Sequence, residues 1–148
     1  MEIKILKNII LVSGGFDPIH SGHIKLIEEA STHGNVIVLL NSDLWLRKKK
    51  GKEFLPFNER EIIMSALRHV VDVISFDDSD KTCINGIKKT ILKYPKHSIK
   101  FANGGDRSNE TTPETIFCDD NDVETLWNIG GNNKSNSSSW ILEKWNKN

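Results

Sequence analysis

Residues 9–24 restrict the possible folds more than any other part of this sequence. An apolar run at 9–12 is followed by Gly14 and Gly15, and a helical pattern of apolar residues begins at Ile24. This order predicts a buried strand, a tight turn and a helix. Glycines at such a junction let the backbone come close to a ligand, because they lack a Cβ and accept positive φ. The N-terminus of the following helix would present N–H groups and a partial positive charge, which favour phosphate.

Two histidines, His20 and His23, lie on either side of Gly22 at the predicted start of that helix. At this spacing both imidazoles can face one anion and stabilise the charge of a phosphoryl group in its transition state. Two other interpretations are a plain surface pair and half of a metal site. A metal site would need further Cys or His ligands at suitable spacing, and the remaining histidines lie on separate segments. We therefore interpret both histidines as catalytic and predict no metal bound by them.

Length and composition predict one domain, residues 1–148, of an ordinary globular protein. The chain is long enough for a hydrophobic core, with 37% hydrophobic and 27% charged residues. Its 20 basic and 20 acidic side chains cancel, so no overall field favours nucleic acid or an anionic membrane as a partner. The run at 9–12 is too short for a signal peptide or a membrane span. Cys83 and Cys118 match no metal or redox spacing, so we expect free thiols and a cytoplasmic protein.

Apolar strand patterns alternate with helical ones along the whole chain, which predicts an α/β fold with a parallel sheet and helices on both faces. Five strands are expected, at 8–13, 35–40, 70–76, 98–102 and 123–129. Helices are expected to begin near Gly22, Asn58, Thr82, Thr112 and the serines at 137–139. In such sheets ligands bind beyond the carboxyl ends of the strands.

The expected helix ends rest on local signals. Gly34 is interpreted as the C′ residue of the first helix. Asn58, with Glu61 three residues later, forms a predicted capping box after Pro56. Pro113 suits the first position of a helix capped by Thr112.

Five of the six residues from Arg47 to Lys52 are cationic, and they follow the strand expected at 35–40. Charge runs usually form solvated faces. Here the run is expected as a loop that leaves the sheet at its ligand edge, where a triphosphate and a phosphorylated acceptor would need neutralising. We select Lys49 and Lys50 as catalytic residues and leave open which lysines of 48–52 contact substrate.

Two further charged residues are candidates for binding the acceptor. Asp43 follows the strand expected at 35–40, and Arg60 lies in the first turn of the helix expected after Pro56. Arg60 can also be a plain surface charge. A first-turn position would let it reach into the crevice at the strand ends.

Glycine turns and serines supply the expected nucleotide-binding set. Asp106, after a second Gly-Gly turn, could bind a ribose hydroxyl, the acceptor or magnesium, or could close the turn. The serines at 137–139 are either helix caps alone or caps that also hold a phosphate. The full set is Gly14, Gly15, Phe16, Asp17, Gly22, Gly105, Asp106, Ser137, Ser138 and Ser139.

Four motifs together resemble the signature of the cytidylyltransferase-like nucleotidyltransferases, a HIGH-type family with a Rossmann-like fold. They are the HxGH sequence at 20–23, Asn-Glu-Arg at 58–60, Gly-Gly-Asp at 104–106 and the three serines at 137–139. The resemblance covers nearly the whole chain. It implies that His20 and His23 bind a nucleoside triphosphate and stabilise the pentacoordinate phosphorus while an acceptor phosphate attacks and pyrophosphate leaves. Mg²⁺ is expected with the triphosphate.

The motifs at 41–43, 73–76 and 104–106 look like those of glycero-manno-heptose 1-phosphate adenylyltransferase. Asn-Asn-Lys-Ser at 132–135 stands where glycerol-3-phosphate cytidylyltransferases carry Arg-Thr-Glu-Gly. Leu142 replaces an arginine of the nicotinamide-mononucleotide and phosphopantetheine adenylyltransferases, which disfavours both. The resemblance therefore implies ATP or CTP as donor and a sugar phosphate or polyol phosphate as acceptor. The segment 107–112 fits none of these groups.

Three hypotheses follow for function. The first is an enzyme that transfers AMP or CMP to a small phosphorylated acceptor. The second is a nucleotide-binding module without turnover, and the third is a scaffold that keeps the fold alone. The intact histidine pair favours the enzyme. Trp140 and Trp145 fit either core packing or a homodimer contact.

Overall fold

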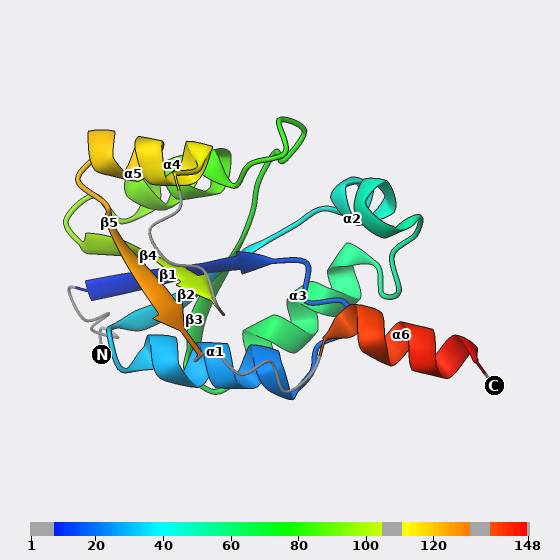
Figure 1. The fold of residues 1–148 in the computed structure, drawn as a ribbon. Coiled ribbons are helices and arrows are strands. Elements are labelled where there is room, and N and C mark those ends of the chain that lie inside the picture. The colour runs from blue at the N-terminus through cyan, green and yellow to red at the C-terminus, as the bar shows by residue number, and fades with distance from the viewer. Residues whose placement is uncertain (1–7, 105–110, 131–136, 148) are drawn as a thin grey trace.

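The computed structural model describes residues 8–104, 111–130 and 137–147. Five parallel strands form one sheet in the order β3-β2-β1-β4-β5 (Figure 1), which confirms the predicted α/β class. The strands are β1 (Asn8–Gly14), β2 (Asn35–Leu40), β3 (Val70–Ser75), β4 (Ser98–Gly104) and β5 (Glu124–Ile129). These bounds agree with the expected strands except for shifts at their ends.

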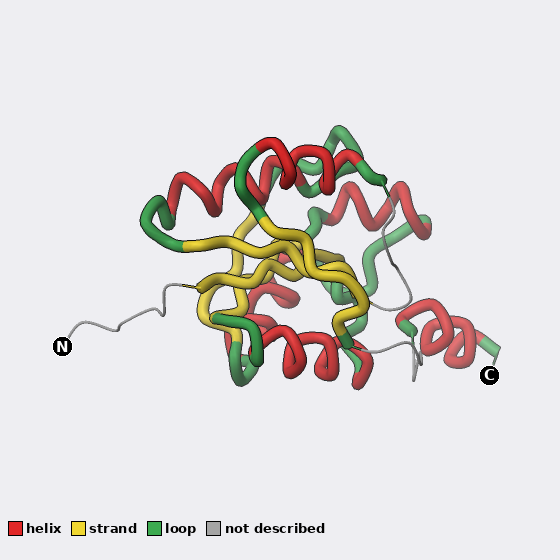
Figure 2. Tube along the Cα trace, turned by 60° about the vertical axis from the view of Figure 1, so that its left-hand side comes forward, coloured by secondary structure: helices red, strands yellow, loops and turns green. Residues whose placement is uncertain are grey.

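Helices cover both faces of the sheet (Figures 1 and 2). The helices of the described ranges are α1 (Ser21–Ser31), α2 (Asp43–Lys50), α3 (Phe57–Ala66), α4 (Ile84–Lys93), α5 (Pro113–Asp120) and α6 (Ser138–Asn146). Figure 1 shows α1 and α3 below the sheet, α4 and α5 above it, and α6 beyond its edge. No helix in the described ranges has the length and apolar character that crossing a bilayer requires.

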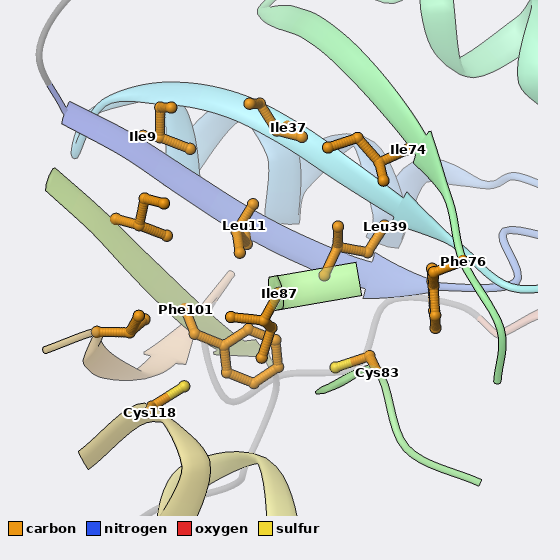
Figure 3. Close-up of a cluster of buried hydrophobic side chains, with 12 residues drawn as sticks. Ile9, Leu11, Ile37, Leu39, Ile74, Phe76, Cys83, Ile87, Phe101 and Cys118 are labelled. Atoms are coloured by element: carbon orange, nitrogen blue, oxygen red, sulfur yellow. The ribbon is translucent and has the colours of Figure 1, made fainter. Parts of the chain in front are cut away.

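The core consists of two layers, one on each face of the sheet. Ile9 and Leu11 of β1 point into the layer under α4 and α5 (Figure 3), whereas Ile10 and Val12 point into the layer against α1 and α3. All four are fully buried. A strand buried on both faces reads as a continuous apolar run, which is why the run at 9–12 was a reliable signal.

The order of the strands creates a crevice between β1 and β4. From β1 the chain enters α1 on one face, whereas from β4 it continues to α5 on the other face. The connections after these two neighbouring strands therefore diverge. In open parallel sheets ligands bind at such a point.

The helix starts correct two expectations and confirm one. The Asn58–Glu61 capping box is wrong, because α3 begins at Phe57 with Pro56 as its N-cap and no capping side chain. Helix α4 begins at Ile84 rather than at Thr82. At α5 the prediction is confirmed: Thr112 Oγ1 accepts the Thr115 N–H at 3.2 Å, with a proline at the start of the helix.

Gly34 is also not the C′ residue of α1, whose C-cap is Thr32. Its φ lies outside the left-handed region, and a Cβ there would come within 2.7 Å of the Asn8 carbonyl oxygen. The glycine therefore serves close packing between the end of α1 and β1, and not helix termination.

The cationic run is not a loop. Residues 43–50 form α2, whose N-cap Ser42 accepts the Trp45 N–H at 3.1 Å. Gly51 ends the helix with φ 92°, in the left-handed region. Arg47 and the lysines at 48–50 fill the last turn of α2. Cations are favoured there because the carbonyl groups at the end of a helix carry a partial negative charge.

Both cysteines are free and buried, as expected. Burial raises the pKa of Cys83 to about 12 and that of Cys118 to about 11. The thiolate is the reactive form of cysteine, so neither side chain is suited to nucleophilic chemistry.

Candidate functional site

His20 and His23 form a stacked pair at the start of α1. Their ring centroids are 3.8 Å apart, with 27° between the planes. His20 is the N-cap of α1, and its Nδ1 accepts the N–H of Gly22 at 3.0 Å. His23 Nδ1 accepts the N–H of His20 at 3.3 Å. The two rings thus form a reciprocal capping box, in which imidazole nitrogens replace the usual oxygens.

These contacts determine the tautomers. A ring nitrogen that accepts a hydrogen bond carries no proton, so each neutral imidazole has its proton on Nε2. Burial, followed by the charges of His20, Lys49 and Lys50, lowers the pKa of His23 to about 3. His23 is therefore neutral at physiological pH, and its Nε2–H can donate to an anion.

The turn before α1 is closely packed. A Cβ on Gly15 would lie 2.6 Å from Leu46 Cδ2 of α2, so any other residue would require the buried Leu46 side chain to move. Phe16 has φ 49°, in the left-handed region, and is buried. Its ring meets the edge of His23 at a centroid distance of 4.8 Å. Gly14, Gly15 and Phe16 therefore hold the histidines against the end of β1.

Asp17 is a structural anchor in this turn. Its side chain has 0% exposure, and its two carboxylate oxygens accept the N–H groups of Phe54 at 2.6 Å and Leu55 at 2.7 Å. Lys50 Nζ lies 3.5 Å from the same carboxylate and also donates to the Asp17 carbonyl oxygen. The carboxylate expected to contact nucleotide therefore joins the histidine turn to the segment after α2.

Arg60 is buried, and the expectation that it reaches into the crevice to bind the acceptor is wrong. Its side chain has 0% exposure. The guanidinium donates to the carbonyl oxygens of Leu55, Gly15 and Asn41, at 2.9, 3.0 and 2.8 Å. It also bonds to Asp43 Oδ1 at 2.7 Å. Arg60 thus fastens three loops that surround the site, and Asp43 is its ion-pair partner.

Sequence reasoning missed Asp78, which lies after β3 and is 6% exposed. Its carboxylate accepts the Asn41 Nδ2–H at 3.0 Å, the Ser42 N–H at 2.8 Å and the Ser42 hydroxyl at 2.7 Å. The Ser42 oxygen in turn caps α2. Asp78 therefore orients α2 and its cations. An acid directly after a strand was visible in the sequence, but its partners lie 36 and 37 residues away.

A chamber of about 370 Å³ opens where β1 and β4 end. Ser13 and Gly14 of β1 line it, together with Asn103 of β4. Polar groups from outside the sheet also line it, namely Asn41, Lys49, Lys81, Thr82 and Glu114. The rest of the wall is mostly apolar and includes Leu26, Trp45 and Phe101. The chamber thus occupies the crevice that the strand order creates.

The two lysines selected from the cationic run have different environments. Lys49 lines the chamber, and its Nζ lies 4.7 Å from the centroid of the Trp45 ring. Lys50 is engaged by Asp17. Lys49 is therefore placed to meet a ligand in the chamber, whereas Lys50 supports the turn that carries His20 and His23.

The serines at 137–139 begin α6. Ser137 is its N-cap and accepts the Trp140 N–H at 3.0 Å. Ser138 Oγ donates to the Pro18 carbonyl oxygen at 2.7 Å. The predicted capping role is confirmed for Ser137. Ser138 ties α6 to the histidine turn, and a role of these serines and Ser139 in binding phosphate stays a prediction.

Two expected site residues, Gly105 and Asp106, lie outside the described residues, as do residues 107–110 and 132–135. Within the described ranges, no cluster of three His, Cys, Asp or Glu side chains could hold a metal ion. The Asp17 carboxylate is also taken up by backbone amides and Lys50. Magnesium that enters with the triphosphate needs only one or two protein carboxylates, so it stays a prediction.

Fold and geometry define the class: a parallel α/β domain with a histidine pair capping the first helix, and a chamber lined partly by lysines at the ends of β1 and β4. The model of the family described as "Cytidylyltransferase-like" matches residues 11–128. The chain belongs to this family of nucleotidyltransferases, which confirms the family predicted from the motifs.

Curated relatives include the bifunctional protein HldE of Pelobacter propionicus, which is 31% identical over 145 residues. That match covers 94% of this chain and 28% of the relative. HldE of Aliarcobacter butzleri is 32% identical over 88% of this chain and 29% of its own length. The chain thus spans less than a third of these relatives.

Two solved structures share the fold. One is the lipopolysaccharide core biosynthesis protein from Thermoplasma volcanium, with a TM-score of 0.61 and 21% identity over 81% of this chain and 93% of that chain. The other is a nicotinate-nucleotide adenylyltransferase, so named only provisionally, from Vibrio parahaemolyticus. Its TM-score is 0.55, with 18% identity over 96% of this chain and 88% of that chain. At these identities the likeness concerns the fold.

Proposed function

We propose that the protein transfers a nucleotidyl group, AMP from ATP or CMP from CTP, to the phosphate of a small sugar or polyol and releases pyrophosphate. One observation carries the proposal. The stacked His20 and His23 have their Nε2–H donors at the N-terminus of α1. Neither imidazole lines the chamber, but Gly14, just before their turn, does, and Lys49 of the chamber wall contributes to the lowered pKa of His23. The membership in a nucleotidyltransferase family supports it.

The chemistry requires no covalent intermediate. An oxygen of the acceptor phosphate forms a bond to the α-phosphorus of the triphosphate. The bond between that phosphorus and the oxygen that bridges it to the β-phosphorus breaks. The acceptor oxygen is already an anion, so no base has to remove a proton. Catalysis then depends on positioning and on stabilising the negative charge that spreads over the phosphoryl oxygens.

Different residues would bind the reacting groups and position them. The Nε2–H groups of His20 and His23 donate to the reacting phosphoryl group. Lys49 supplies positive charge at the wall of the chamber. Asp17, Lys50 and Arg60 position these groups without contacting substrate, because their polar atoms are engaged in holding the loops together. Mg²⁺ is expected to enter bound to the triphosphate, and no step above depends on it.

The motif resemblance to glycero-manno-heptose 1-phosphate adenylyltransferase favours AMP and a sugar 1-phosphate within this proposal. The identity of 31–32% to HldE proteins over most of the chain agrees with that preference. Glycerol 3-phosphate with CTP is the second pairing to test.

The test is pyrophosphate release from each of the four ribonucleoside triphosphates with a panel of acceptors. The panel contains glycero-manno-heptose 1-phosphate, mannose 1-phosphate, glucose 1-phosphate and glycerol 3-phosphate. We expect turnover with ATP or CTP and at least one of these phosphates. Binding of triphosphate without turnover on the whole panel would support a nucleotide-binding module instead.

The histidine variants give the first prediction. We expect His20→Asn and His23→Gln each to lower kcat by more than about 100-fold, the scale of one lost transition-state donor. Asn is a good N-cap and Gln suits the third helical position, so both variants should keep α1 folded. His33→Ala, on an exposed residue after α1, is the control. A wild-type rate in His23→Gln would contradict the assigned role.

A further inference from the structure

The floor of the chamber contains a buried amide that lacks a partner. Asn103, near the end of β4, is 7% exposed. Its Nδ2 makes no hydrogen bond within the described residues. The proposed function does not use this group, and the sequence analysis did not select it.

An unpaired buried donor requires an explanation. Nearly all buried polar groups in native proteins have a hydrogen-bond partner, and leaving one without a partner destabilises the fold. Asn103 lines a chamber with room for a ligand. Because Nδ2 itself is buried, the amide has to turn toward the chamber before a ligand oxygen there can supply the missing acceptor.

The other groups in the wall indicate what kind of ligand fits. Lys49 and Lys81 bring two positive charges, which suit a phosphate. Glu114 brings a carboxylate, which suits the hydroxyl groups of a polyol. The Thr82 hydroxyl already donates to Asp80 Oδ1 and accepts the Ile84 N–H, so its part in binding is smaller. Together with the Asn103 amide, this lining combines recognition of an anion with recognition of uncharged hydroxyls.

We propose that Asn103 is a specificity-determining residue that donates its Nδ2–H to a hydroxyl oxygen of the phosphorylated acceptor. Lys49 and Lys81 hold the phosphate of that acceptor. The inference rests on the proposed function, because it assigns the chamber to the acceptor and leaves the nucleoside triphosphate to the histidine turn. Asn103 thereby selects polyhydroxylated phosphates over inorganic phosphate.

The experiment compares Asn103→Ala and Asn103→Asp with the wild type. Titration calorimetry measures the affinity for glycero-manno-heptose 1-phosphate, mannose 1-phosphate, glucose 1-phosphate, glycerol 3-phosphate and inorganic phosphate. Kinetics measures KM separately for acceptor and triphosphate. Asn121→Ala is the matched control, because its Nδ2 donates to the Phe117 carbonyl oxygen at the far end of α5.

In Asn103→Ala we expect the affinity for the best acceptor to fall about tenfold, the value of one hydrogen bond, with KM for triphosphate within about twofold of wild type. Affinity for inorganic phosphate should not change. Asn103→Asp should bind the acceptor more weakly still, because a carboxylate replaces the donor and repels phosphate. The Tm without ligand should stay equal or rise in Asn103→Ala, since an unpaired buried group is removed. A purely structural asparagine would lower it.

Two results would overturn the inference alone: unchanged acceptor affinity in both variants, or a rise in KM for triphosphate instead of acceptor. The second would mean that Asn103 contacts the nucleotide. If the wild type binds acceptors but never releases pyrophosphate, the proposed function fails, and the affinities still decide the role of Asn103. If the wild type binds no member of the panel, the inference fails too.

Discussion

His20 and His23 serve folding and chemistry with different atoms of the same rings. Each Nδ1 accepts a backbone N–H at the start of α1, which places the proton of the neutral ring on Nε2. The orientation of the donors is therefore set before substrate arrives. Such preorganisation is what makes hydrogen-bond donors effective in stabilising a transition state.

The lowered pKa of His23 predicts how stability depends on pH. The pKa falls from 6.5 to about 3 in the folded protein, so between these values the unfolded chain binds more protons. His23 therefore destabilises the fold progressively as pH drops below 6.5, by up to about 1.4 kcal/mol per pH unit. We expect urea unfolding between pH 6.5 and 5 to show a steeper loss of stability in wild type than in His23→Gln. Equal slopes would contradict this assignment.

The two lysines of α2 should separate in their effects. Lys49→Met should lower kcat/KM by at least about tenfold while changing the unfolding free energy by less than about 1 kcal/mol, the scale of an exposed cation–π contact. Lys50→Met should lower the unfolding free energy by about 1–3 kcal/mol, because Asp17 keeps a buried charge without its cation. Denaturant unfolding and steady-state kinetics on both variants measure this. If Lys49→Met lowered mainly stability and Lys50→Met mainly activity, the two assignments would be wrong.

The sequence was sufficient to predict which residues near the turn matter, but not which groups they contact. Glycines, histidines and the run at 9–12 carry local signals. The burial of Arg60 depends on carbonyl groups of residues 15 and 41, which are 45 and 19 positions away. No local sequence pattern predicts a contact between residues so far apart. An arginine in a first helical turn was therefore expected to face the crevice.

At the scale of elements, α3 fastens the site through one side chain. Removing the guanidinium of Arg60 would leave several buried carbonyl oxygens and Asp43 without their donor. We expect Arg60→Met to lower the unfolding free energy by about 3–5 kcal/mol. Arg60→Lys should not restore it, because an ammonium cannot reproduce the planar set of donors.

Arg68→Ala is the matched control for this variant, since Arg68 is exposed. It should change stability by less than about 0.5 kcal/mol. Chemical denaturation with a common slope for all three variants gives the comparison. Equal stability of Arg60→Met and wild type would refute the anchoring role.

Elements with an apolar period or a clear cap signal were predictable, whereas α2 was not. The strands and α1 follow patterns of buried residues. Helix α2 has Leu46 as its one buried residue and ends in four cations, so its sequence resembles a charged loop. Its helical state depends on the Ser42 cap, which Asp78 holds from another segment. Core packing, one of the two alternatives for Trp140 and Trp145, is excluded, because both are exposed and α6 has no buried residue. Their role in a homodimer stays a prediction.

At the scale of the whole molecule, the alternation of strands and helices was sufficient to predict a parallel α/β sheet. The order of the strands was not predicted, because any of the crossovers could have been placed on either side of β1. That order puts the ends of β1 and β4 side by side and opens the chamber between them. The position of Asn103 follows from this arrangement and from no local motif.

Helix α6 carries no buried side chain and reaches the rest of the protein through contacts such as that of Ser138 with Pro18, and of Trp145 with Phe54. A helix without core packing opens at little free-energy cost. Its amide hydrogens should therefore exchange with solvent before those of α1 or β1. Since Pro18 belongs to the turn that carries His20, any ligand that immobilises this turn should slow exchange in α6 as well, which makes the last helix a natural reporter of site occupancy.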